Sequence, residues 1–177
     1  MFLIYYYKKI ILYDFLNKFK YNNINQIPYI KKIILYFNYK KIDFKLLLIS
    51  LMVLELLTFQ KSRITKSKKI NIKLKIKIGN PVGCKITLRK KSIYFFFDKL
   101  FFNDIIKKKL YTLKINSKKF TINLKIKNIL NFIELKKHYN ILKNLYFLNV
   151  TIVMHSNTNK ELIFLLLSYK FFKILQM

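Results

Sequence analysis

The segment from Gln60 to Arg89 contains two runs in which apolar and polar residues alternate. The apolar members are Ile70, Ile72, Leu74, Ile76 and Ile78 in the first run, and Cys84, Ile86 and Leu88 in the second. Successive side chains of a strand point to opposite faces. The pattern therefore predicts a basic β-hairpin at residues 70–89 with one apolar face. We expect its turn at residues 79–83, where Gly permits positive φ and Pro fixes φ.

The rest of the chain shows both helical and extended periodicities. Helices are predicted over residues 5–19, 44–59, 92–107 and 160–169, and strands over residues 30–37 and 148–154. Ser92 is the predicted N-cap of the third helix. Residues 107–130 show weaker strand alternation, clearest at residues 120–126, and residues 136–145 could form a helical turn or two. No linker interrupts the 177 residues, so we expect a single domain over residues 1–177. This order of elements predicts an α+β fold, an antiparallel sheet with helices packed on one face.

The charge of the chain is strongly unbalanced. It has 36 Lys and Arg residues against 7 Asp and Glu, a formal net charge of +29, and only Arg63 and Arg89 are arginines. Ala and Trp are absent, a bias that indicates an extremely AT-rich genome, as in organelles and some reduced bacteria. That bias inflates Lys but does not explain the scarcity of acids. The imbalance predicts a polyanionic partner, with nucleic acid favoured over an anionic membrane surface.

Residues suited to catalysis or metal binding form no constellation in the sequence. Cys84 is the single cysteine, His138 and His155 lack ligand spacing, and Asp98 and Asp104 fit the solvated face of a predicted helix. Cys84 falls on the inward face of the predicted hairpin, which favours a buried, inert thiol. We therefore expect no enzymatic activity, no metal and no cofactor.

No segment has the character of a membrane span. The apolar runs at residues 46–59 and 162–167 are shorter than the roughly 20 residues that a spanning helix needs. The first 13 residues resemble neither a secretory signal nor an Arg- and Ser-rich transit peptide. We expect a protein that does not enter the membrane and that, if it works in an organelle, is made there.

The density of lysines on the predicted hairpin is the strongest functional signal. Lysines two positions apart on a strand lie about 6.5–7 Å apart, close to the phosphate spacing along a nucleic-acid strand. The candidates are Lys73, Lys75, Lys77, Lys85 and Arg89, extended upstream by Lys61, Arg63, Lys66, Lys68 and Lys69.

Three other interpretations compete with nucleic-acid binding. One is a solvated sheet face without function in a Lys-biased sequence. A peripheral protein on anionic lipid would need an amphipathic helix with lysines and exposed aromatic residues, whereas these lysines cluster on predicted strands. An RNA-processing enzyme would need an acidic metal-binding cluster, which the sequence lacks.

The same stretch is similar to a known family. QKSRITKSKK followed by IKIGNPVGCKITLR resembles the universal large-subunit ribosomal protein five family of bacterial type, which binds 5S rRNA. The segments FKYNNINQIPYIKKIIL, IYFFFDKL and LNVTIVMHSNTNKELIFLL resemble further parts of that family in the same order. The resemblance covers nearly the whole chain. Residues 107–132 depart from it, because they contain no Gly where the family is rich in Gly, Arg and Ser.

The resemblance implies a single α+β domain that is a structural constituent of the large ribosomal subunit, located in the central protuberance and active in translation. Together with the coding bias it implies an organelle-encoded mitochondrial version on ribosomes of the matrix, with a plastid as the weaker alternative. The implied partners are large-subunit rRNA, 5S rRNA if this ribosome contains one, the peptidyl-site tRNA and neighbouring ribosomal proteins. One of those neighbours would belong to the head of the small subunit.

The resemblance also implies two groups of site residues. The rRNA-binding group is Asn22, Gln26, Lys31, Lys32, Gln60, Lys61, Arg63, Thr65, Lys66, Lys68, Lys69, Lys73, Lys85 and Arg89. The tRNA-facing loop is Lys75, Lys77, Gly79, Asn80, Pro81, Val82 and Gly83.

Overall fold

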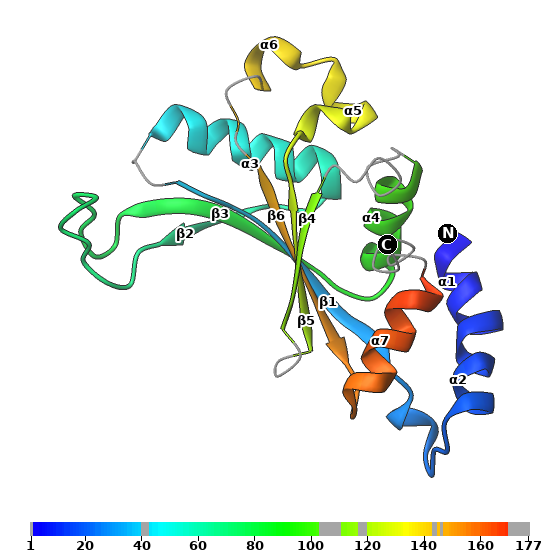
Figure 1. Cartoon of the computed structure of the whole chain (residues 1–177). Helices are drawn as coiled ribbons and strands as arrows, with labels where there is room; N and C mark the ends of the chain where they lie inside the picture. The colour runs from blue at the N-terminus through cyan, green and yellow to red at the C-terminus, as the bar shows by residue number, and fades with distance from the viewer. Residues whose placement is uncertain are drawn as a thin grey trace.

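The computed structural model describes residues 2–39, 43–102, 111–116, 120–142, 145 and 147–169. Within these residues, six strands form one antiparallel sheet in the order β2-β3-β1-β6-β5-β4 (Figure 1). The strands are β1 (Tyr29–Asn38), β2 (Arg63–Lys66), β3 (Pro81–Leu88), β4 (Tyr111–Asn116), β5 (Thr121–Ile126) and β6 (Leu148–His155). The predicted α+β class with an antiparallel sheet is confirmed.

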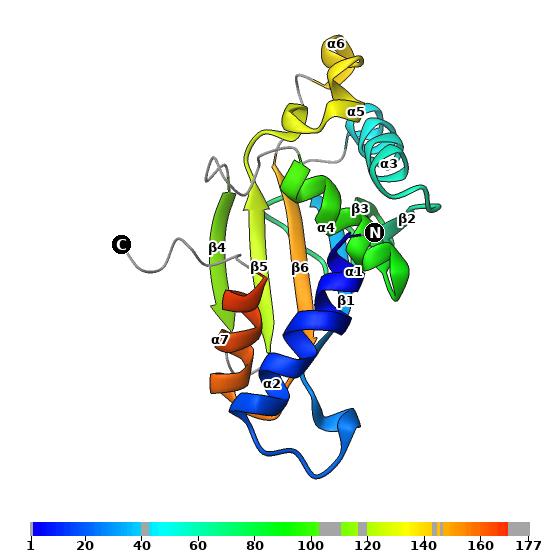
Figure 2. The same ribbon diagram turned by 90° about the vertical axis from the view of Figure 1, so that its right-hand side faces the viewer.

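One face of the sheet is apolar. Leu35 pairs with Ile86 in β3 and with Val150 in β6, and Val150 pairs with Leu124 in β5. Directly paired residues share a face, so these buried side chains form a continuous layer over four strands. Figure 2 shows α1 (Phe2–Tyr6), α2 (Leu12–Lys18), α4 (Lys91–Phe102) and α7 (Asn159–Ser168) in front of this sheet.

The two ends of the chain pack against each other on that face. α1, the π-helical turn η1 (Tyr7–Ile11) and α2 follow one another without a break, so the helix predicted over residues 5–19 begins earlier. Phe15 of α2 meets Phe164 of α7 edge-on, with ring centroids 4.9 Å apart. α7 begins with a capping box, in which the Thr158 hydroxyl accepts from the Glu161 amide and the Glu161 carboxylate accepts from the Thr158 amide. The helix predicted over residues 160–169 is therefore confirmed.

Helices α3 (Phe44–Thr58) and α4 complete the cover of the sheet. The Asp43 side chain caps α3 by accepting from the amides of Lys45 and Leu46. α4 starts at Lys91, so the prediction of Ser92 as its N-cap was wrong. The Ser92 hydroxyl instead accepts a hydrogen bond from the Gln60 amide group at 3.0 Å, a long-range partner that local sequence does not reveal.

Short helical turns connect the remaining elements. They are η2 (Ile24–Gln26), η4 (Ile129–Asn131), α5 (Ile133–Lys136) and α6 (Tyr139–Leu142). The weak alternation at residues 107–130 corresponds to β4 and β5, and the expected turns near residues 136–145 correspond to α5 and α6. Residues 103–110, which include Asp104 and the predicted end of the third helix, lie outside the described residues.

The basic hairpin is present, but its first strand is not where the alternation placed it. β3 pairs with β2, with Arg63 opposite Lys85 and Ile64 opposite Cys84. Residues 70–78 instead lie in a long loop between β2 and β3, and Ile70, Ile72 and Ile78 are 64%, 87% and 64% exposed. Figure 1 shows this hairpin extending away from the helices.

The physical reason is that residues 70–78 have no free sheet edge to pair with, and of their five apolar side chains only Ile76 is buried. Pro81 and Gly83, predicted as part of the turn, belong to β3, where they pair with Lys66 and Asn38. The edge of β3 is therefore already occupied by β2, and β3 starts at Pro81. Alternation favours a strand only where one face can be buried, which is why β3 itself obeys the predicted pattern and residues 70–78 do not.

Candidate nucleic-acid interface

The second face of the sheet is polar and is not covered by α1, α2, α4 or α7 (Figure 2). A row of directly paired residues crosses five strands on this face, from β2 to β5. Its members are Arg63, Lys85, Tyr36, Asn149 and Lys125. Strand alternation places them there because their chain neighbours Cys84, Ile86, Leu35, Phe37, Val150 and Leu124 point into the core. The row offers two cations, an aromatic ring, an amide and a third cation in sequence across the sheet.

Arg63 and Lys85 form a pair of like charges. They are directly opposite each other in the β2–β3 register, and both are exposed. Like charges directly opposite on a sheet destabilise it. The fold therefore holds two cations together at the expense of some stability, and an anion bound between them would relieve the repulsion.

The rest of the open face carries short polar side chains and an aromatic ring, together with the aliphatic Ile34 and Val153. The Thr151 hydroxyl donates to the Asn123 side-chain oxygen at 2.8 Å, across β5 and β6. The Lys125 ammonium lies 3.2 Å from the centroid of the Phe147 ring. These groups suit hydrogen bonding and stacking with nucleotides, which RNA-binding sheets use together with cations.

The loop between β2 and β3 is closed at its base by Ser67. The Ser67 amide donates to the Asn80 carbonyl at 2.9 Å, the Gly79 amide donates to the Ser67 carbonyl at 3.1 Å, and the Ser67 hydroxyl donates to the Lys77 carbonyl. Gly79 has φ +86°, which only Gly adopts without strain. The loop is therefore a defined structure at its base, but the turn predicted at residues 79–83 was wrong in its position, because Pro81, Val82 and Gly83 belong to β3.

The tip of the loop is a second, smaller turn. Asn71 and Ile76 pair as an isolated antiparallel bridge, and the Lys75 amide donates to the Ile72 carbonyl at 3.1 Å. Lys75 itself has φ +53°. The turn presents exposed lysines and aliphatic side chains together, where the alternation predicted separate faces.

The structure brings only part of the predicted residues together. Arg63, Thr65, Lys66 and Lys85 lie in the paired strands of the hairpin, and Arg89 follows β3 directly. The loop contains Lys68, Lys69, Lys73, Lys75, Lys77, Gly79 and Asn80, and β3 contains Pro81, Val82 and Gly83. All the lysines in these two groups are exposed.

The other predicted residues lie elsewhere. Asn22 and Gln26 belong to the connection before β1, where the Gln26 side chain accepts from the Asn22 amide at 3.3 Å. Lys31 is the extra residue of a β-bulge between Ile30 and Lys32, and Lys32 lies on the open face opposite Val153. Asn22 and Gln26 therefore lie near the first residues of β1, whereas β3 pairs with the second half of β1.

Gln60 and Lys61 stand between α3 and β2. The Gln60 side chain turns toward α4, and Lys61 is exposed. The carboxylate of Glu55 accepts from the Ser62 amide at 2.9 Å and from the Ser62 hydroxyl at 2.8 Å. These hydrogen bonds lower the pKa of Glu55, and they fix the approach of the chain to β2.

Four residues of the open face were missed by the sequence reasoning. They are Tyr36, Asn123, Lys125 and Asn149. A signal was available, because each occupies the outward position between two buried apolar residues of its strand. That signal shows that each side chain points outward, but not that the four share one face, which depends on how the strands pair.

Within the described part of the chain, no group of three or more His, Cys, Asp or Glu residues could hold a metal ion. Cys84 is buried, and burial raises the pKa of its thiol. In the same residues, no helix is long and apolar enough to cross a membrane.

Comparison with known proteins identifies the family. No family model matches the chain. The mitochondrial large ribosomal subunit protein uL5m of Reclinomonas americana is 36% identical over 163 residues, which cover 88% of each chain. The chain belongs to the uL5 family. The uL5 of Nitrosomonas eutropha is 33% identical over 171 residues, 93% of this chain and 94% of that protein. The uL5 of Wigglesworthia glossinidia brevipalpis is 46% identical over 97 residues, 54% of each.

Membership in the uL5 family agrees with the resemblance read from QKSRITKSKK and IKIGNPVGCKITLR. Two relatives that match 88% or more of the chain are a mitochondrial protein and a bacterial one. Both kinds of relative are named as proteins of the large ribosomal subunit.

Proposed function

We propose that this chain is a structural constituent of the large subunit of a mitochondrial ribosome, where it binds rRNA through the open face of the sheet and the β2–β3 hairpin. The likeness to uL5m over 88% of the chain supports both the subunit and the organelle. The AT-biased composition agrees with an organellar gene. In this proposal the role of the chain is structural and not enzymatic, since its relatives are named as ribosomal proteins.

The observation on which rRNA binding chiefly rests is the pairing of Arg63 with Lys85. Two exposed cations held face to face suit the closely spaced phosphates of RNA. Tyr36 lies next to Lys85 in the same row and could stack on a base, while Asn149 follows it as a hydrogen-bonding group. Arg63 is one of two arginines, and its planar guanidinium can bind phosphate with two hydrogen bonds.

We further propose that the loop of residues 67–80 contacts the peptidyl-site tRNA. The loop extends away from the body of the protein (Figure 1) and carries five exposed lysines, Lys68, Lys69, Lys73, Lys75 and Lys77. Contacts through lysine and phosphate are independent of base sequence, as required of a surface that every tRNA must pass. In this proposal the protein lies in the central protuberance, beside 5S rRNA where the ribosome has one and near a protein of the small-subunit head.

A paired-charge experiment tests rRNA binding. Arg63→Gln/Lys85→Gln should weaken binding to a 5S rRNA transcript or a large-subunit rRNA fragment by about tenfold or more, the loss of two charge-assisted contacts. Its free energy of unfolding should not fall, because the like-charge repulsion is removed. The matched control is Lys136→Gln/Lys137→Gln, which removes two exposed charges near α5. Filter binding and urea unfolding measure the two quantities.

Sedimentation of an organelle lysate tests the assignment to the ribosome. The chain should migrate with the large subunit at moderate salt and be released as salt rises.

In the paired-charge experiment, equal RNA affinity of Arg63→Gln/Lys85→Gln and of its control would argue against the open face as the binding surface. Migration with membranes, together with binding to RNA-free vesicles of anionic lipid, would favour the peripheral-membrane alternative instead.

A further inference from the structure

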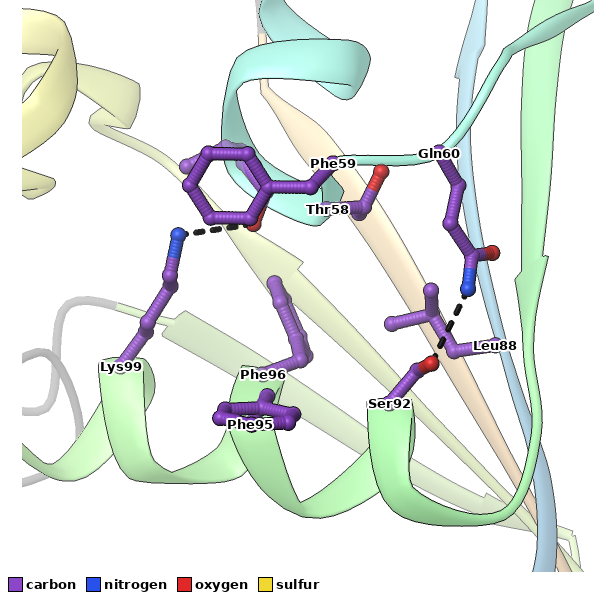
Figure 3. Close-up of a pocket in the computed structure, with 9 residues that line it drawn as sticks. Thr58, Phe59, Gln60, Leu88, Ser92, Phe95, Phe96 and Lys99 are labelled. Atoms are coloured by element: carbon purple, nitrogen blue, oxygen red, sulfur yellow. Dashed lines mark hydrogen bonds between the residues drawn. The ribbon is translucent and has the colours of Figure 1, made fainter. Parts of the chain in front are cut away.

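A cavity of about 290 Å³ opens between the end of α3 and the start of α4, beside the hairpin base rather than on the open face. Figure 3 shows the aromatic side chains of Phe59, Phe95 and Phe96 around it, with Lys99 on one side and the Gln60–Ser92 hydrogen bond on the other. Leu57, Thr58 and Leu88 complete its lining. The cavity is therefore apolar and aromatic in the middle and polar at two sides.

Phe59 occupies a conformation that does not suit it. It follows α3 as the C-cap with φ +54° and ψ +30°, the left-handed region, where helices usually place Gly or Asn because a side chain is strained there. The ring is 81% exposed, so burial does not offset that strain. Lys75, Lys90 and Phe120 also have positive φ in the described part of the chain, so Phe59 is distinguished by its exposure and its place at the cavity.

Lys99 holds the Phe59 ring in place. The Lys99 ammonium lies 4.4 Å from the ring centroid, donates to the Leu57 carbonyl at 3.0 Å and pairs with the Glu134 carboxylate at 2.8 Å. A cation is attracted to the face of an aromatic ring, and Phe59 as a residue stays 81% exposed. Phe95 is 49% exposed on the same cavity. Two aromatic surfaces are thus presented to solvent at one site.

The residues that flank the cavity are basic. Lys61 follows Gln60, and Arg89, Lys90 and Lys91 connect Leu88 to Ser92; all four are exposed. Of the nearby acids, Glu134 is paired with Lys99, and Glu55 accepts from Ser62. This charge disfavours a second copy of a +29 chain and favours a polyanion. Aromatic surfaces flanked by cations are the arrangement that binds unstacked bases and their phosphates.

We propose that this cavity binds one unpaired, flipped-out nucleotide of rRNA. Its base would stack on Phe59 and Phe95, and its phosphates would contact Lys61, Lys90 and Lys91. The Gln60 and Ser92 side chains lie where a base edge could form hydrogen bonds. The inference rests on the proposed rRNA-binding function and adds a second site to it, separate from the row on the open face.

Two RNA hairpins test the site, one fully paired and one with a single unpaired adenosine in its stem. The wild-type chain should bind the bulged RNA about tenfold more tightly, within the range measured for stacking of one base on an aromatic side chain. Phe59→Gly should lose that preference and keep its affinity for the paired RNA. Its melting temperature should rise, because Gly relieves the left-handed strain, so unfolding cannot account for the loss. Phe44→Ala, which removes an exposed ring at the other end of α3, is the control and should keep the preference.

The outcomes separate the two proposals. A wild-type chain that binds neither RNA would contradict the proposed function itself. A chain that binds both RNAs, with Phe59→Gly retaining any preference for the bulge, would overturn only the nucleotide site. Unchanged RNA binding by Phe59→Gly combined with poor incorporation into reconstituted subunits would also overturn it, in favour of a protein contact at the same cavity.

Discussion

Position 83 needs Gly because strand β1 passes too close for a side chain, and not because of the backbone dihedral angles there. A Cβ atom at this position would lie 2.1 Å from the Phe37 carbonyl oxygen of β1. Gly83→Ala should therefore lower the free energy of unfolding by about 2–3 kcal/mol, because β1 and β3 must separate. Urea denaturation followed by circular dichroism measures the change.

Gly79→Ala is the matched control for that substitution. Gly79 has φ +86°, and nothing lies within 4 Å of its added Cβ, so only backbone strain of about 1 kcal/mol is expected. Equal losses at the two positions would show that the approach of β1 to Gly83 is not the constraint. The sequence pattern predicted that both glycines belong to a turn. It could not distinguish them, because the contact with Phe37 is made by a strand more than 40 residues earlier in the chain.

At the scale of elements, Lys99 links three helices. It reaches from α4 to the end of α3 and to Glu134 of α5. Partial burial raises the pKa of Glu134, but the hydrogen bond from Lys99 and one from the backbone outweigh it, so the net shift is downward from 4.5. A carboxylate with a lowered pKa stabilises the fold above its unfolded pKa, and that stabilisation is lost as the pH falls through its folded pKa.

Glu134→Gln should reveal this dependence on pH. At pH 7 the substitution should lower the free energy of unfolding by about 0.5 kcal/mol, a small value because solvent screens this partly exposed pair. By pH 3 the difference should be smaller, since the wild-type carboxyl becomes neutral as the pH falls through its lowered pKa. Urea unfolding of both proteins at the two pH values measures it. A difference that persists undiminished at pH 3 would indicate that packing, not charge, is responsible.

Local periodicity predicted most elements, and its one large error is instructive. Ile33, Leu35 and Phe37 alternate and form β1, while Ile70, Ile72 and Ile78 alternate equally well and form a loop. The difference is tertiary, because β1 lies between β3 and β6 whereas residues 70–78 extend past the sheet. For the same reason the open-face row of Tyr36 and Asn149 was not predicted, since it exists only once β1 and β6 pair.

Over the whole molecule, basic residues are unevenly distributed along the chain. Residues 43–59 contain one basic residue, Lys45, against Asp43 and Glu55, whereas residues 63–88 of the hairpin and its loop contain eight basic residues and no acidic one. The helices bury one face of the sheet, while the open face and the extended loop carry cations, as do the exposed surfaces of α5 and α7. The composition predicts that the partner is negatively charged. The position of the surface that binds this partner depends on which face of the sheet the helices cover.

This uneven distribution of basic residues predicts how the binding of tRNA responds to salt. Suppose that Lys73, Lys75 and Lys77 each neutralise one phosphate of tRNA. The slope of log K against log salt concentration then contains roughly 0.7–0.9 for each phosphate contact. Replacing all three lysines by Gln should therefore make this slope less steep by about 2–3. The side chains are exposed, so the fold should be unaffected, as circular dichroism would show. Titration of tRNA into the protein at several salt concentrations measures the slope.

The control for this prediction must carry the same net charge. Lys136→Gln/Lys137→Gln/Lys160→Gln also removes three exposed lysines, changing the formal charge from +29 to +26, but from α5, the residue after it, and α7. Because counterion release counts contacts and not net charge, the control should keep the wild-type slope. Equal slopes for the two triple variants would mean that tRNA binds through the general charge of the protein, and the loop would then have no special role.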